Sequence, residues 1–160
     1  MRNHVRNRLV FAKTSEKLKS STRPRFCIEI GDANLPEVKK QVIGQGKVLS
    51  KATIFGDLIF ISGIGPHDPK TGKQVEGGIR EQTKAVMDLL KAAVEEAGSC
   101  MDNILKCTVF LTDMNYYSIV NEIYSSYFKV PPARTCVQVS KLPRPEENCM
   151  IEIDAIACKA

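Results

Sequence analysis

Two stretches with helical periodicity separate runs that are typical of β-strands, and this alternation most constrains how the 160-residue chain can fold. In the first stretch, residues 79–97, apolar residues recur at steps of three and four. Gly98 follows it and favours helix termination. The second stretch begins near Asp113 or Asn115, either of which can cap a helix, and continues to about Phe128. Each stretch has one apolar stripe, so both predicted helices must pack against something.

The β-rich runs supply the layer against which these helices can pack. Two of them flank a short turn at Gly56-Asp57 and predict a hairpin. The predicted strands are residues 48–54, 58–62, 104–111, 135–139 and 150–157. The resulting order, β-β-α-β-α-β-β, predicts an α+β fold with a mixed sheet and both helices on one face. Several strands are apolar on both alternations, so self-association is expected to cover the second face.

The positive charge of the chain is concentrated at its N-terminus. The formal net charge is +5, yet residues 1–25 hold eight basic residues and one acidic residue, and the remainder holds 15 and 17. This tail resembles a mitochondrial transit peptide in composition, or a basic arm without an address. No long apolar run predicts secretion or a membrane span. We therefore expect a cytoplasmic or mitochondrial matrix protein with a tail at 1–25, an entry segment at 26–46 and one domain at 47–160.

Several kinds of site are excluded by residue spacing. The six cysteines form no C-x-x-C pair and the chain has two histidines, so a structural metal site is not expected. The motifs of serine hydrolases, P-loop proteins, zincins and dinucleotide-binding proteins do not occur. His67 stands alone in a Pro/Gly-rich turn, where a solvated side chain is expected. The cysteines are interpreted as small thiols in a reducing compartment.

Two residues near the C-terminus are the main candidates for chemistry. Arg134 follows two prolines and opens a strand, so its guanidinium extends from a stiff segment and can bind a carboxylate with two parallel hydrogen bonds. Glu152 lies within an apolar strand, opposite in direction to Ile151 and Ile153. A carboxylate in that setting requires a partner or a function. From the pattern alone, exposure or a structural Arg–Glu pair remains an alternative.

The chain from about residue 47 to 159 resembles the RidA (YjgF/YER057c) family. The motifs that carry the resemblance are residues 61–63 with 68–72, 106–111 with 120–124, and 132–137 with 151–157. The resemblance implies a chorismate-mutase-like α+β fold that forms a homotrimer, with active sites in the clefts between subunits. It also implies hydrolysis of reactive enamines and imines, such as 2-aminoacrylate, to 2-keto acids and ammonia without a cofactor.

The resemblance assigns roles by position. Arg134 would bind the substrate carboxylate, and Glu152 would activate the attacking water. Cys136 would line the pocket and offer its backbone carbonyl to that water, while Ser62 and Asn121 would line the site. Leu49 stands where many members of the family have a tyrosine, so the pocket loses a hydroxyl and the substrate preference is open.

Two alternatives to the deaminase remain. The first is an endoribonuclease or translation inhibitor, an activity also attributed to the family. RNA binding depends on basic surface, and the chain outside the tail has a slight acidic excess, so a nucleic-acid partner is not expected. The second is a trimer that binds a small carboxylate without turnover. No membrane partner is expected.

Overall fold

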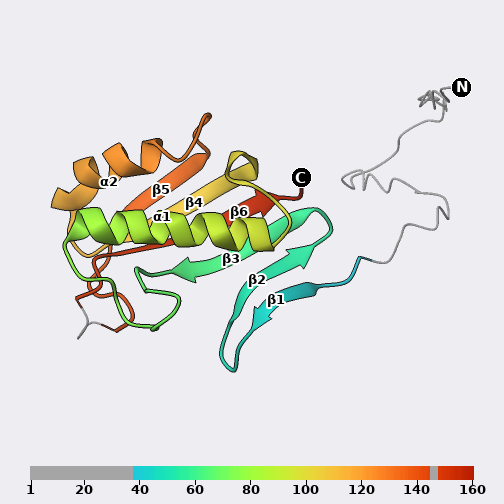
Figure 1. Cartoon of the computed structure of the whole chain (residues 1–160). Coiled ribbons are helices and arrows are strands. Elements are labelled where there is room, and N and C mark those ends of the chain that lie inside the picture. Colours follow the sequence, from blue (N-terminus) through green and yellow to red (C-terminus); the bar gives the residue numbers. More distant parts are fainter. Residues whose placement is uncertain (1–37, 145–147) are drawn as a thin grey trace, which may run out of the picture. The chain divides into compact units, whose positions relative to one another are not determined.

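The computed structural model describes residues 38–144 and 148–160, which form one six-stranded sheet and two helices (Figure 1). The sheet order is β1-β2-β3-β6-β4-β5, and β4–β5 is the parallel pair. The strands are β1 Gln41–Gln45, β2 Ser50–Phe55, β3 Leu58–Ile64, β4 Ile104–Leu111, β5 Ala133–Gln138 and β6 Ile151–Cys158. The helices are α1 Ile79–Glu96 and α2 Tyr117–Ser125. The predicted order is confirmed from the hairpin onward, and the predicted basic tail lies outside the described residues.

Both helices lie on the same face of the sheet, as predicted (Figure 1). α1 buries a stripe that includes Val86, Leu90 and Val94, each with no exposed surface, against β3 and β6. The opposite stripe of the helix is charged, which gives an amphipathic helix whose core face fixes its orientation. Arg80 on this outer stripe donates two hydrogen bonds to the Glu122 carboxylate of α2, both of 2.9 Å, and links the helices.

The C-terminus of α1 ends where the sequence predicts it. Gly98 has a φ of 82°, its N–H donates to Glu95, and the Ser99 N–H donates to Val94, which is a Schellman motif. Alanine at Gly98 would meet no atom within 4 Å, so only the left-handed backbone would oppose it. We expect Gly98→Ala to lower the free energy of unfolding by about 1 to 2 kcal/mol.

Urea denaturation can measure this effect against a matched control. Gly78 at the other end of α1 has a φ of −97°, and an added Cβ would have only an ordinary contact with Glu81. Gly78→Ala should therefore change the midpoint much less than Gly98→Ala. Equal midpoints for Gly98→Ala and the unsubstituted chain would contradict the prediction.

α2 is shorter than predicted. A 3-10 turn, Met114–Tyr116, precedes it, and the Asp113 carboxylate accepts a hydrogen bond from the Asn115 N–H at 2.9 Å. Asp113, one of the two predicted cap residues, therefore caps this 3-10 turn, whereas α2 itself follows Tyr116 without a side-chain cap. The helix ends at Ser125 rather than near Phe128, because the chain must turn into β5.

The strand β1 lies in the entry segment at 26–46, where the sequence allowed one edge strand without fixing its bounds, and it pairs with β2 along most of its length. Its sequence, QVIGQ, has two apolar residues followed by a glycine, a weak pattern for a strand. Pairing with β2 supplies the hydrogen bonds that the pattern does not indicate.

The sheet face that points away from the helices carries apolar side chains. Leu58 and Phe60 of β3 are 41% and 42% exposed, and Val137 of β5 is 38% exposed. Their strand neighbours, such as Ile59 and Ile61, are buried beneath the helices. This alternation agrees with two apolar faces, and self-association over the second face stays a prediction.

Candidate active site

Arg134 lies on the helix face of the edge strand β5. The β5 register pairs Arg134 with Cys107 of β4, and Cys107 pairs with Ala155 of β6. Cys107 and Ala155 are buried in the core beneath the helices. Directly paired residues point to the same face of a sheet, so Arg134 also points toward the helices. The parallel connection from β4 to β5 runs through α2 and thereby places this helix beside Arg134.

Side chains of α2 hold the guanidinium of Arg134 by one of its nitrogens. Nη2 donates to the Asn121 Oδ1 at 2.7 Å and to the Tyr117 hydroxyl at 3.2 Å. The guanidinium carbon lies 4.8 Å from the centre of the Tyr124 ring, a cation–π distance. Within the described residues, Nη1 and Nε hydrogen-bond to no protein atom. Nη2 is therefore held by the chain, while the N–H groups of Nη1 and Nε remain available to a ligand.

A cavity of about 370 Å³ opens beside this guanidinium and is lined by Met114, Tyr117, Arg134 and Cys136. Burial raises the pKa of the Cys136 thiol, and the nearby Arg134 charge opposes this change. A protonated thiol is a poor nucleophile, which suits a wall of the cavity rather than an attacking group. We call Arg134, Asn121, Tyr117 and Cys136 the Arg134 group.

Glu152 lies on the other face of the sheet. It pairs with Phe110 of β4, while its neighbours Ile151 and Ile153 are buried under the helices, as the alternation predicts. Burial raises the pKa of the Glu152 carboxyl, and the charge of Asp154 on the same face raises it further. No ion pair joins Glu152 to a cation within the described residues.

The end of β3 lies beside this carboxylate. A Cβ added to Gly63 would lie 2.9 Å from the Glu152 Cδ and closer still to its Oε1. The preceding residue, Ser62, donates its hydroxyl to the Ser50 carbonyl at 2.7 Å. Leu49 adjoins Ser50 and is 62% exposed. We call Glu152, Gly63 and Ser62 the Glu152 group, and Leu49 lies next to it in the hairpin.

One chain does not bring the two groups together. Arg134, Asn121 and Cys136 share the helix face, whereas Glu152 lies on the opposite face with β4 between the two strands. The structural Arg–Glu pair considered from the sequence is therefore not formed within the chain. Tyr117 was not among the predicted site residues, because it lies outside the apolar stripe of the predicted helix and in none of the motifs that carry the family resemblance.

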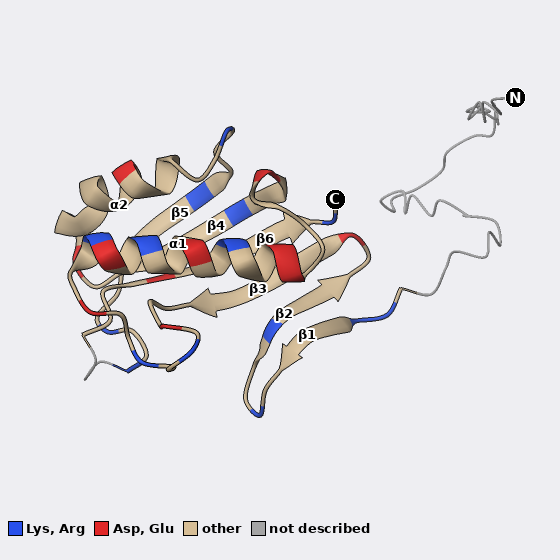
Figure 2. Cartoon of the chain, in the orientation of Figure 1, with Lys and Arg blue, Asp and Glu red and all other residues tan. Residues whose placement is uncertain are grey.

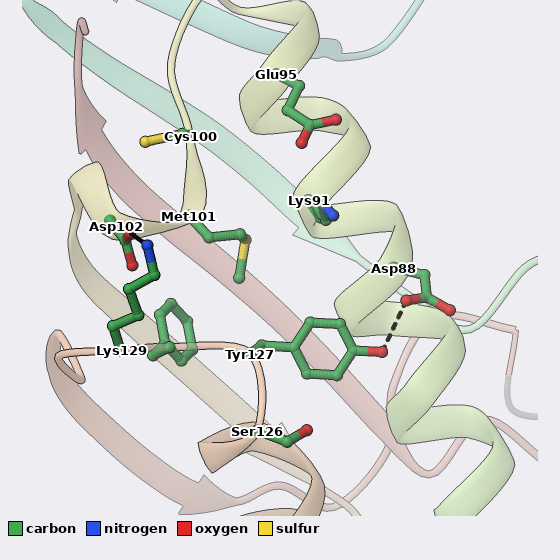
Figure 3. Close-up of a pocket in the computed structure, with 10 residues that line it drawn as sticks. Asp88, Lys91, Glu95, Cys100, Met101, Asp102, Ser126, Tyr127 and Lys129 are labelled. Carbon is green, nitrogen blue, oxygen red and sulfur yellow. Dashed lines mark hydrogen bonds and ion pairs between the residues drawn. The ribbon is translucent and has the colours of Figure 1, made fainter.

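Other features of the described chain do not add to this candidate site. A hollow of about 470 Å³ lies between α1 and the segment that follows α2, where the Tyr127 hydroxyl donates to Asp88 at 2.7 Å (Figure 3). Burial and Asp88 raise the pKa of Tyr127 to about 12. Lys129 pairs with Asp102 at 3.4 Å, so these polar groups satisfy one another. His67 is half-buried rather than solvated as expected from its turn.

Residues 38–144 and 148–160 contain neither a cluster suited to a metal ion nor a helix suited to a membrane span. No three His, Cys, Asp or Glu side chains lie close enough to hold a metal ion. Neither helix has the length and hydrophobicity needed to cross a membrane.

Comparison with known proteins shows which family has this combination of fold and residues. The family model described as endoribonuclease L-PSP matches residues 41–159. A RutC family protein of Pyrococcus abyssi is 46% identical over 69% of this chain and 85% of its own length. TdcF of Escherichia coli, provisionally named a reactive intermediate deaminase, is 36% identical over 66% of this chain and 81% of its own length.

Solved structures agree with these relatives. The Rid family protein YyfA of Yersinia pestis, 38% identical, superimposes with a TM-score of 0.70 over 75% of this chain and 99% of that one. E. coli TdcF with bound serine superimposes with a TM-score of 0.67 at 32% identity, over 74% and 94% of the two chains. The fold is thus the mixed-sheet α+β fold of small proteins in the L-PSP group. The chain belongs to the RidA (YjgF) family, as its motifs indicated.

Proposed function

We propose that the protein hydrolyses small 2-imino acids, and the enamines that tautomerise to them, to 2-keto acids and ammonia. The observation that carries the proposal is the half-held guanidinium of Arg134. Nη2 is fixed by Asn121 and Tyr117, Nη1 and Nε keep N–H donors for a ligand, and Arg134 lines a cavity large enough for a small acid. A charged guanidinium N–H is a strong donor to a carboxylate oxygen. Serine bound to the relative TdcF is also a small carboxylate.

Glu152 supplies the proton transfers that this reaction needs. Its carboxylate accepts a proton from water as the water oxygen bonds to the iminium carbon and the C=N π electrons move to nitrogen. The protonated Glu152 then returns the proton to that nitrogen, and the C–N bond breaks as the C=O bond forms. The hydroxyl proton passes to the Glu152 carboxylate and then to the leaving ammonia, so ammonium leaves and Glu152 is again ionised. A carboxyl whose pKa is raised by burial suits both transfers better than a solvated one.

The two groups must come from different copies of the chain to act on one substrate. Arg134 and Glu152 lie on opposite faces of one sheet, so a molecule of a few heavy atoms cannot contact both. The apolar face around Glu152 favours self-association. We infer a homotrimer in which the Arg134 group of one copy faces the Glu152 group of the next. Light scattering should give the mass of three chains.

The proposal is tested with an imine made in place. A pyridoxal-phosphate-dependent dehydratase releases 2-aminoacrylate from serine, and semicarbazide competes for the resulting imine. The protein should increase pyruvate formation at the expense of the trapped product. A rate equal to the spontaneous one, for a chain shown to be folded and oligomeric, would overturn the proposed activity.

Tyr117→Phe should weaken substrate binding modestly. The Tyr117 hydroxyl accepts from Arg134, so its own hydrogen is free to donate toward the cavity. Removal of one such hydrogen bond should raise KM for the imine about 3- to 10-fold with a smaller change in kcat. Tyr116→Phe, one residue earlier and outside the cavity lining, is the matched control. An unchanged KM in Tyr117→Phe would contradict this role.

The family description also names an endoribonuclease, and the charge pattern does not favour it. Lysine and arginine alternate with acidic residues along α1 rather than forming a basic surface (Figure 2). The same preparations can be tested on single-stranded RNA. If ligand binding depends on Arg134 but no imine is hydrolysed, the non-catalytic carboxylate-binding trimer would replace the deaminase.

A further inference from the structure

The carboxylate of Glu152 occupies the space that a side chain at position 63 would need. A Cβ on Gly63 would lie 2.9 Å from the Glu152 Cδ and 3.3 Å from its Cγ. Distances of this size to Cδ are too short for real Cβ contacts, so one of the groups would have to move. The neighbouring strands explain the approach, because β3 pairs with β6 and their register shifts between Ile61 and Ile64, where Gly63 lies.

Backbone conformation does not explain the glycine. Five other described glycines have positive φ, but Gly63 is not one of them. An alanine at position 63 would therefore have no left-handed strain to overcome. The space beside Glu152, rather than the freedom of the backbone, requires a residue without a side chain here.

The conflict would be relieved by movement of the Glu152 side chain. Its carboxylate is the far end of a flexible chain and forms no ion pair among the described residues, so displacing it requires little rearrangement of the sheet. The carboxylate would move from its half-buried position toward solvent. Such a change affects chemistry more than folding, because a displacement of about 1 Å can lower a rate 100-fold.

We propose that Gly63 is a positioning residue for Glu152: the absent side chain allows the carboxylate to lie against β3 and face the substrate. This inference rests on the proposed function. It adds a steric requirement beyond the presence of Arg134 and Glu152, namely that position 63 has no side chain.

The test is a double-mutant cycle between positions 63 and 152. Gly63→Ala should lower kcat for the imine about 10- to 100-fold with little change in KM or melting temperature. Because the carboxylate becomes more exposed, the acidic limb of its kcat profile should also shift to lower pH. Glu152→Asp alone should lower kcat, since the shorter side chain withdraws from the substrate. In Gly63→Ala/Glu152→Asp the shorter aspartate fits beside the new methyl group. The fold decrease in kcat of this double variant should therefore be smaller than the product of the fold decreases of the two single variants.

Gly65→Ala is the matched control. Its added Cβ would press on the His67 ring, with Cε1 at 2.7 Å, rather than on Glu152, so kcat should be nearly unchanged. A wild-type chain without imine hydrolysis would reject the proposed function itself. An active wild type with an equally active Gly63→Ala, or with independent effects at the two positions, would overturn the positioning role. If Gly63→Ala fails to fold, refolding by added Glu152→Asp supports the role and continued failure overturns it.

Discussion

Replacing Arg134 by lysine is expected to lower kcat/KM for the imine about 100-fold while the fold remains intact. The guanidinium uses Nη2 for Asn121 and Tyr117 and keeps the N–H donors of Nη1 and Nε for the substrate. A lysine ammonium is a single point of charge, so it cannot bind Asn121 and Tyr117 through one nitrogen and the substrate through others. Loss of two charge-assisted hydrogen bonds accounts for an effect of this size. Competition between imine hydrolysis and semicarbazide trapping measures it.

A second arginine of the same chain provides the control. Arg80 also donates two hydrogen bonds to one carboxylate, that of Glu122, but it lies on the exposed stripe of α1. Arg80→Lys should leave kcat/KM nearly unchanged, because exposed ion pairs contribute little and no substrate contact is lost. Wild-type kcat/KM in Arg134→Lys would show that guanidinium contacts with the substrate carboxylate are not part of the reaction.

Much of the fold follows from periodicity because the helices and central strands are strongly patterned. The stripe of α1 and the glycine that ends it leave few alternatives, and the structure places its helix end at Glu96, one residue before the predicted one. The bounds of β1 are different, since its five residues include only two apolar ones and a glycine, and its place in the sheet comes from pairing with β2. Patterns within a segment cannot reveal hydrogen bonds supplied by another segment.

The candidate site also combines residues whose placement the sequence predicts with residues whose placement it does not. Alternation along β6 predicts the face of Glu152, because neighbouring isoleucines must enter the core. It does not predict that Arg134 faces the helices, since this depends on the register of the parallel pair β4–β5. Tyr117 and Gly63 were missed for a related reason. Their roles arise from contacts across α2–β5 and β3–β6, which have no period in the sequence.

Glu152→Gln is expected to lower kcat about 1,000-fold with a small change in KM. Glutamine keeps the size of the side chain but cannot accept the proton of the attacking water, and general-base catalysis contributes about 100- to 10,000-fold. Because the base acts deprotonated, wild-type kcat should rise with pH through the raised pKa of Glu152. The midpoint of this rise should lie above the ordinary pKa range of a glutamate. The residual activity of Glu152→Gln should not show the rise.

The same substitution should stabilise the fold near neutral pH. Burial raises the pKa of Glu152 in the folded chain above its unfolded value. The favourable contribution of the bound proton is full below the unfolded pKa and is lost as pH rises through the folded pKa. Glu152→Gln avoids this loss, so its melting temperature should exceed the wild-type value at neutral pH, and the difference should shrink in acid. Lower stability at neutral pH would argue against burial as the cause.

Mixing two inactive variants distinguishes a site shared between copies from a site within one chain. When Arg134→Ala and Glu152→Gln are unfolded together and refolded at equal concentration, some interfaces combine the intact Glu152 group of one copy with the intact Arg134 group of its neighbour. Random assembly should restore about one quarter of the wild-type activity in a cyclic oligomer. Each variant refolded alone controls for recovery. Because Arg134 and Glu152 lie on opposite faces of each sheet, recovered activity can arise only between chains. An inactive mixture of correctly assembled oligomers would exclude the shared site.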